Sequence, residues 1–329
     1  MEFLKRNSFK ILLSLLFLFH LFIYKDFFLK NKIVFPSNFL VQFYSPWSTQ
    51  IFPNWEQGIP HKPIGVDQFR FFYPVRSFIN ESFQNREFPL WNPYIFSGNP
   101  VTADFQSAAF YPLSIIYLFI PQITAWSILI IIEPLLAVLG MYLFLKKINI
   151  ENLSAFLGAI AFGYSGFMTV WGQENMVVPH AALWLPFILW ALEEFLTSGK
   201  YRYLLLTVLF LTFSFLAGFF QLTFYIFIFI FIYGLFRIIN LKTKLFLNFF
   251  LLFVIFFLTL LLSSIQFLPS LEGFFRSPRT TSGVWYLFET YLVPITHLVN
   301  IYIPDIFGNP GAYNFFGRGF YHETLIYVY

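Results

Sequence analysis

The sequence predicts an all-α membrane protein: a polytopic bundle of transmembrane helices with a large first loop that contains helices in the membrane interface. Of its 329 residues, 58% are hydrophobic and 11% are charged. The mean hydropathy of +0.69 lies outside the usual range of soluble domains. Apolar runs recur at lengths that can cross roughly 30 Å of hydrocarbon. Lysines and arginines gather in the short segments between these runs.

Several functional classes are disfavoured by what the sequence lacks. It contains no cysteine, so disulfides, thiolate metal sites and a cysteine nucleophile are excluded. It has no Walker loop, GxSxG elbow or HExxH helix, which argues against ATP hydrolysis, a serine hydrolase and a zinc peptidase. The net charge is +4 without a dense basic stripe, so we expect no nucleic-acid partner.

Seven membrane spans are predicted. The first follows the basic start "MEFLKRNSFK"; because no small-residue cleavage site comes after it, an uncleaved span is favoured over a signal peptide. The stretch Tyr203–Phe236 is too long for one helix and is predicted to be a helical hairpin that turns at Gly218–Gln221. The predicted spans are residues 11–24, Thr124–Leu145, Leu153–Trp171, Leu183–Leu196, the two halves of Tyr203–Phe236, and Leu245 to about Phe267.

The short connections predict the orientation. With these spans, ten basic residues fall on one side: Lys5, Arg6, Lys10, Lys146, Lys147, Lys200, Arg202, Arg237, Lys242 and Lys244. The positive-inside rule makes that side cytoplasmic, and the N-terminus with it. Two long loops, about 25–122 and 268–323, are therefore expected outside. We expect one transmembrane domain over residues 1–329, the N-terminal portion of a longer architecture, because "YHETLIYVY" begins a new apolar run.

The first long loop is rich in aromatic residues and proline. From Phe69 onward, Phe72, Ile79 and Phe83 recur near helical spacing, which predicts an amphipathic helix in the membrane interface. Pro74 should kink or restart this helix. Such a loop suits a protein that takes a lipid head group, and the alternative is an aromatic belt that only anchors the chain.

Asp67 and Asp104 are the candidate catalytic acids of this loop. Each precedes a short apolar segment, so each could instead be a helix N-cap. As a pair at the outer surface, one carboxylate could act as general base toward an acceptor hydroxyl, and either could hold a divalent cation such as Mg²⁺ or Mn²⁺.

Four polar residues near the spans are further candidates. Glu133 lies within a span, where an ionisable group is costly and suggests a function, although Pro134 beside it equally suggests a local kink. Glu174 and His180 are expected on a short outer connection that could reach the same site, where a lone histidine is commonly a solvated loop residue. Gln221 is either a helix cap or a pocket wall.

The second long loop offers cations. Arg276 and Arg279 are permanently charged, fork-shaped donors suited to a phosphate or pyrophosphate, and Glu272 could orient one of them. The alternative is that these charges serve only solubility at the surface.

A family resemblance rests on six motifs in order: "GVDQFRFFYP", "FPLWNPYIFSGNPVTADFQSAAFYPL", "GYSGFMTVWGQEN", "ALWLPFILWALEEF", "LAGFFQ" and "LPSLEGFFRSPR". Together they resemble the YfhO family of bacterial multipass proteins over nearly the whole chain. That family is similar to GT-C glycosyltransferases, membrane enzymes that take a sugar from a polyprenyl-phosphate carrier on the outer face. One departure is "AGFFQ", where relatives often carry His or Pro near the Gln.

The resemblance implies an all-helical GT-C-like fold in the bacterial cytoplasmic membrane and transfer of a lipid-linked sugar to an envelope glycan or polymer. It implies that Asp67 is the essential acid of the first loop, that Asp104 is a second acidic motif position, and that Arg279 contacts the lipid phosphate. The alternative function is a transporter or flippase of a lipid-linked envelope component, which Glu133 and the break near Gly218 favour.

Overall fold

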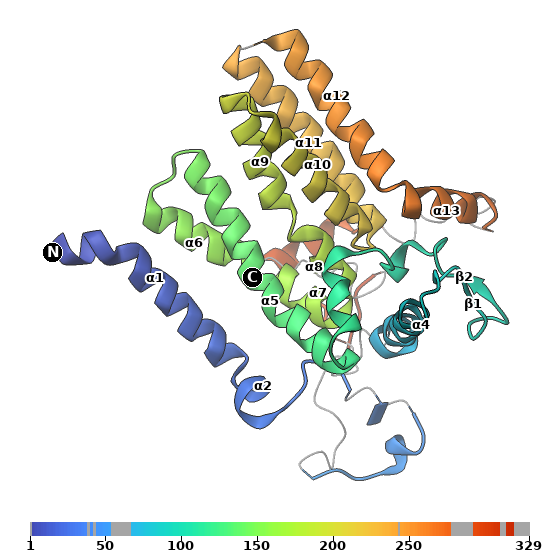
Figure 1. Cartoon of the computed structure of the whole chain (residues 1–329). Helices are drawn as coiled ribbons and strands as arrows, with labels where there is room; N and C mark the ends of the chain where they lie inside the picture. The colour runs from blue at the N-terminus through green and yellow to red at the C-terminus, as the bar shows by residue number, and fades with distance from the viewer. Residues whose placement is uncertain are drawn as a thin grey trace.

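The computed structural model is a helical bundle, as predicted, and it describes residues 2–37, 40–41, 44–53, 67–242, 244–277, 292–309 and 314–318. Figure 1 shows the long helices side by side, with the segments of the first loop gathered at one end. Among the described residues, five helical segments are long and apolar enough to cross a membrane: Gln122–Lys147, Asn152–Gln173, Val177–Ser198, Phe220–Leu241 and Leu245–Leu262.

These five segments correspond to five of the seven predicted spans. The other two are represented by α1 (Glu2–Ile23), whose apolar part is Leu12–Ile23, and by α10 (Tyr201–Leu216). The 16 residues of α10 rise about 24 Å, less than the hydrocarbon thickness of roughly 30 Å. The predicted hairpin is confirmed: α10 ends at Leu216 and α11 (Phe220–Leu241) begins four residues later, with Gly218 at a φ of +97° between them.

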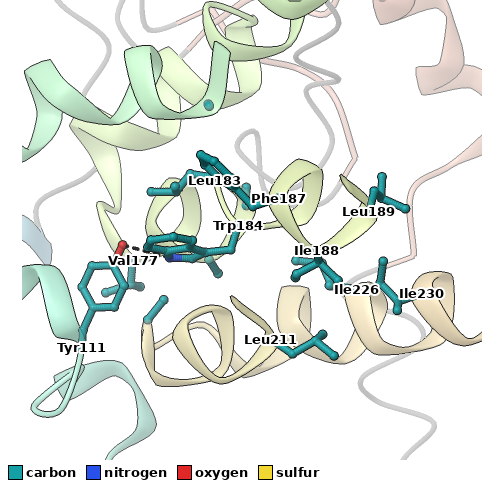
Figure 2. Packing of buried hydrophobic residues seen from close by; sticks show 14 of the residues in the cluster. Tyr111, Val177, Leu183, Trp184, Phe187, Ile188, Leu189, Leu211, Ile226 and Ile230 are labelled. Carbon is teal, nitrogen blue, oxygen red and sulfur yellow. Dashed lines mark hydrogen bonds between the residues drawn. The ribbon is translucent and has the colours of Figure 1, made fainter. Parts of the chain in front are cut away.

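The centre of the bundle is the segment formed by α8 (Val177–Ala182) and α9 (Leu185–Ser198). In the most apolar stretch of this segment, 72% of the residues are buried, against 17% in α12 (Leu245–Leu262) at the edge of the bundle. Figure 2 shows Ile188 of this central segment facing Leu211 and Ile226 of the neighbouring helices, while Leu183 and Phe187 lie on its opposite side. The exposed apolar side chains of α11 and α12 are those expected of a surface that faces lipid.

Helix α5 (Gln122–Lys147) packs closely against α6 (Asn152–Gly163) because small residues lie at the crossing. A Cβ on Gly163 would stand 2.6 Å from Val138 and 2.7 Å from the Pro134 carbonyl oxygen. Pro134 lacks the N–H that would bond the carbonyl of Ile130. The Tyr24 hydroxyl donates to that oxygen over 3.5 Å, which ties the end of α1 to α5.

The connection predicted between Gly172 and Ala182 is mostly helical, contrary to the sequence prediction. After a break at Tyr164, Ser165 caps α7 (Gly166–Glu174) by accepting a hydrogen bond from the Met168 N–H, and α8 follows directly. All six residues of α8 are buried. Burial against the bundle therefore decides the conformation of this stretch, although its polar residues suggest a loop.

The first loop folds into short elements on one end of the bundle. They are α2 (Lys25–Lys30), the turn Trp47–Thr49, the π-helical turn Gln68–Phe72, α4 (Tyr73–Gln84), strands β1 (Trp91–Asn92) and β2 (Asn99–Pro100), and the 3₁₀ helices η3 (Phe105–Ser107) and η4 (Pro112–Leu118). The strands pair antiparallel, with Trp91 opposite Pro100 and Asn92 opposite Asn99.

The helix predicted from Phe69 onward is confirmed, and Pro74 lies in the first turn of α4, where it restarts the helix as predicted. Its place in the membrane interface stays a prediction. Phe72, Val75 and Ile79 form its buried stripe. Two further elements complete the described fold: α13 (Ser264–Phe275), which departs at an angle from α12, and the 3₁₀ helix η6 (Ile295–Ile301) (Figure 1).

Two ends of the bundle can now be defined. The basic end consists of the connections α5–α6, α9–α10 and α11–α12, which lie toward the top of Figure 1. The loop end consists of α4, η3, η4, α7, α8 and the α10–α11 turn. This division agrees with the predicted grouping of the basic residues.

Candidate functional site

At the loop end, three parts of the chain converge on the turn that carries Asp104. Asp104 is the N-cap of η3, and its Oδ1 accepts a hydrogen bond of 3.0 Å from the Gln106 N–H. The cap alternative raised from the sequence is therefore confirmed for this residue. Capping by itself does not exclude a further role for this acid.

The first part to reach this turn is α4, through Arg76. The buried guanidinium donates to the carbonyl oxygens of Ser107 at 3.3 Å and Ala108 at 3.1 Å, and its carbon lies 5.1 Å from the centre of the Tyr117 ring. Burial lowers the pKa of Arg76, yet an arginine remains protonated in a folded protein. Arg76 thus fixes the turn after Asp104 onto the predicted interfacial helix.

The second part is the α10–α11 turn, which is in van der Waals contact with η3. A Cβ on Gly218 would lie 2.9 Å from the Ala108 Cβ and 3.3 Å from the Phe105 carbonyl oxygen. The Phe105 ring packs edge-on against Phe215 and Phe220 on either side of the turn. Gln221, one residue further, is exposed in the first turn of α11 and donates to the Tyr225 hydroxyl at 3.0 Å.

The third part is α13, the helix that carries Glu272 and leads to Arg276. Its buried Gln266 donates to the carbonyl oxygen of Thr102 at 2.8 Å and to Ser270 Oγ at 2.9 Å. Two turns further along α13, a Cβ on Gly273 would be 2.9 Å from the Ala103 Cβ. The segment before Asp104 is thereby seated on α13.

Glu272 and Arg276 form the pair that the sequence predicts. Arg276 Nη2 lies 2.6 Å from Glu272 Oε1, and the two side chains are 79% and 62% exposed. An exposed pair of this kind contributes little stability, because water screens it. Arg276 therefore remains available to an anion, while Arg279 lies outside the described residues.

Asp67 lies on another part of the loop end, next to α7. It is exposed and stands at the N-cap position of the turn Gln68–Phe72, but its side chain makes no capping hydrogen bond. The cap alternative is therefore wrong for Asp67. Its neighbour Gln68 is fully buried and donates to the carbonyl oxygen of Gln173 at 3.0 Å, one residue before Glu174 at the end of α7.

His180 is not the solvated loop residue that its sequence position suggests. It lies in α8, is 1% exposed, and its Nδ1 contacts Oε1 of Glu133, which is 2% exposed within α5. The His180 ring also stacks on Tyr111, with ring centres 4.8 Å apart. Sequence reasoning singled out both residues but did not pair them, because 47 positions separate them and nothing local links α5 to α8.

Tyr111 connects this internal pair to the loop end. Its hydroxyl accepts a hydrogen bond of 3.2 Å from Trp184 Nε1, the dashed line in Figure 2, and lies 3.5 Å from the carbonyl oxygen of His180. Burial raises the pKa of Tyr111 well above its ordinary value, so the phenol is neutral at physiological pH. Tyr111 follows η3 by four residues, so it belongs to the same folded unit as Asp104.

A second internal ion pair lies near the basic end. Arg237 of α11 donates to Glu193 of α9 through both Nε and Nη2, and Tyr233 donates to the same carboxylate. Glu194, the next residue, forms a 2.9 Å ion pair with Lys147 of α5. These contacts hold three helices together.

The structure offers no clear metal centre within the described ranges. There, no group of three or more histidine, aspartate or glutamate side chains is arranged to hold a metal ion.

One comparison decides the family. The model of a family described as bacterial membrane protein YfhO matches residues 102–308, more than half of the chain. The chain belongs to the YfhO family. The matched segment of this YfhO protein begins just before Asp104 and includes Glu133, His180 and Arg276, whereas Asp67 precedes it. Neither a curated protein nor a solved structure matches the chain.

Proposed function

We propose that this YfhO protein is a membrane glycosyltransferase that moves a sugar from a polyprenyl-phosphate carrier to a cell-envelope acceptor. In this proposal the loop end faces outward and the basic end, with the N-terminus, faces the cytoplasm of a bacterial inner membrane, in accordance with the positive-inside rule. The observation that carries the proposal is the exposed carboxylate of Asp67, uncapped and next to a buried, hydrogen-bonded Gln68.

The required chemistry needs a base and a cation. A sugar phosphate has a good leaving group, so displacement at the anomeric carbon needs deprotonation of the incoming hydroxyl and positive charge near the departing phosphate. Asp67 is the proposed base. Arg279 and Arg276 are the proposed phosphate ligands, with Glu272 holding Arg276.

The remaining predicted residues have supporting roles in this proposal. Asp104 is the second acid, and Gln221 at the α10–α11 turn and Glu174 at the end of α7 are the further proposed substrate-binding residues. If the reaction uses Mg²⁺ or Mn²⁺, Asp67 and Asp104 are the expected ligands, and a chelator should then stop transfer.

The test is an envelope glycan analysis in a deletion strain complemented with full-length variants. Asp67→Asn should fail to restore the missing sugar substituent while reaching the membrane in normal amounts. Asp26→Asn is the matched control, because Asp26 is another loop acid, paired with Lys30 and Lys32, with no proposed role. Normal substitution of the glycan by the Asp67 variant would refute the assignment.

A transporter or flippase of a lipid-linked component is the second candidate function. It is favoured by the Glu133–His180 pair, because ionisable groups within a bundle can line a pathway. The two functions differ in what a deletion strain accumulates. Loss of transport should leave the lipid-linked precursor on the inner face, whereas loss of transfer should leave it available outside.

A further inference from the structure

The interior of the bundle contains a titratable pair that sugar transfer does not use. Glu133 comes from α5 and His180 from α8, both are at most 2% exposed, and Oε1 of the carboxyl contacts Nδ1 of the imidazole. Both lie within segments long and apolar enough to cross a membrane, so the surrounding medium is protein and lipid.

Among the residues that the structure describes, the titratable groups of the neighbouring elements leave His180 as the partner able to neutralise Glu133. Tyr111 stacks on the histidine, and Tyr117 of η4 is close enough that Glu133 helps to raise its pKa. Burial is the larger cause of the raised pKa of both tyrosines, so both phenols stay neutral. Tyr24 faces α5 one turn earlier, at the Ile130 carbonyl. Arg76 reaches the Tyr117 ring and the carbonyls of Ser107 and Ala108.

We propose that Glu133 and His180 form a proton-binding site inside the bundle that holds a single proton between them. With one proton the pair is neutral overall, whether the proton is on the carboxyl or on the imidazole. With no proton a bare carboxylate is buried, and with two a bare imidazolium is buried. Either uncompensated charge is strongly disfavoured in a medium of low dielectric constant.

The proton also holds α8 in place. His180 is part of a six-residue helix that is wholly buried, and Val177 at its start approaches the turn at Gly218. A change in the number of bound protons charges the contact between α5 and α8, so it favours separation of the two helices. Through the stacked Tyr111, this separation reaches the turn that carries Asp104. A site of this kind would link proton movement to conformation at the loop end.

The test measures the protonation of both groups in the purified full chain in lipid nanodiscs. Infrared difference spectra report the carboxyl of Glu133, assigned by its loss in Glu133→Gln, and nitrogen-15 spectra report His180, assigned by its loss in His180→Gln. Glu193→Gln is the matched control, because Glu193 is equally buried but is paired with the permanent cation Arg237.

A free glutamate loses its proton at about pH 4.3 and a free histidine at about pH 6.5. The paired site should keep its one proton through this range and above it. In His180→Gln, Glu133 should be a neutral carboxylic acid at pH 7. A carboxylate beside a neutral imidazole at pH 8 in the unmodified protein would overturn the proposal, as would an ionised Glu133 in His180→Gln. The first of these results needs no variant to fold.

Discussion

Replacing Gly218 by alanine tests whether the α10–α11 turn seats the loop that carries Asp104. An alanine at a φ of +97° costs about 1–2 kcal/mol, because an L-residue is strained in this region. The new Cβ would also lie 2.9 Å from the Ala108 Cβ and 3.2 Å from Val177 Cγ1, and overpacking of this kind costs about 1–3 kcal/mol. The expected loss of unfolding free energy is about 2–5 kcal/mol.

Gly199→Ala is the matched control for this prediction. Gly199 also has a positive φ, +68°, but no atom lies within 4 Å of the position of its Cβ. It should therefore lose about 1–2 kcal/mol from backbone strain alone. Denaturant titration of both variants in the same micelles gives the difference, expected to be about 1–3 kcal/mol. Equal losses would show that the turn is not packed against η3.

Three further predictions concern single side chains of the first loop. Arg76→Met should lower the free energy of unfolding by about 2–4 kcal/mol in the same titration, because it leaves the carbonyls of Ser107 and Ala108 without donors. An unchanged denaturation midpoint would show that Arg76 does not fix this turn onto α4. Asp104→Ala should lose about 0.5–2 kcal/mol of unfolding free energy, and Asp104→Asn much less, since the amide oxygen still caps η3. If the stable Asn variant nevertheless loses glycan transfer, the acid does more than cap the helix. Hydrogen bonds from Lys32 and Lys30 lower the pKa of Asp26 from 3.8 to about 2. Its contribution to stability is therefore present above pH 3.8 and lost as the pH falls through about 2, and Asp26→Asn should alter the pH dependence of unfolding in that acid range and nowhere above it.

The helices and the turn at Gly218 could be predicted because their signals are local. Length and hydropathy identify a span, and a glycine within a long apolar run marks a turn, whatever the rest of the chain does. The amphipathic helix follows in the same way from the spacing of Phe72, Ile79 and Phe83, of which Phe72 and Ile79 are buried and Phe83 is half-buried.

The internal contacts could not be predicted, because they depend on partners that are distant in sequence. Arg76 lies between Phe72 and Ile79 on the same face of α4, but nothing in the sequence shows that the carbonyls of Ser107 and Ala108 accept its hydrogen bonds. His180 looks like a loop residue because Asn175 and Pro179 interrupt the apolar pattern, yet burial makes this stretch helical and brings the imidazole to Glu133. A buried polar residue must find a partner, but only the fold shows which one.

The two candidate acids show the same limit. Both precede a short helical segment, so both fit a cap, and the sequence pattern does not distinguish them. The structure does: Asp104 bonds the Gln106 N–H, whereas Asp67 makes no capping bond and is exposed.

The most direct test of the proposed function is sugar transfer by the full-length protein in proteoliposomes. The assay supplies a radiolabelled polyprenyl-phosphate sugar and an envelope acceptor and counts the label that reaches the acceptor. We predict transfer by the unmodified protein and by Asp26→Asn, and none above background by Asp67→Asn. Transfer by Asp67→Asn at the unmodified rate would contradict the role of Asp67 as the base.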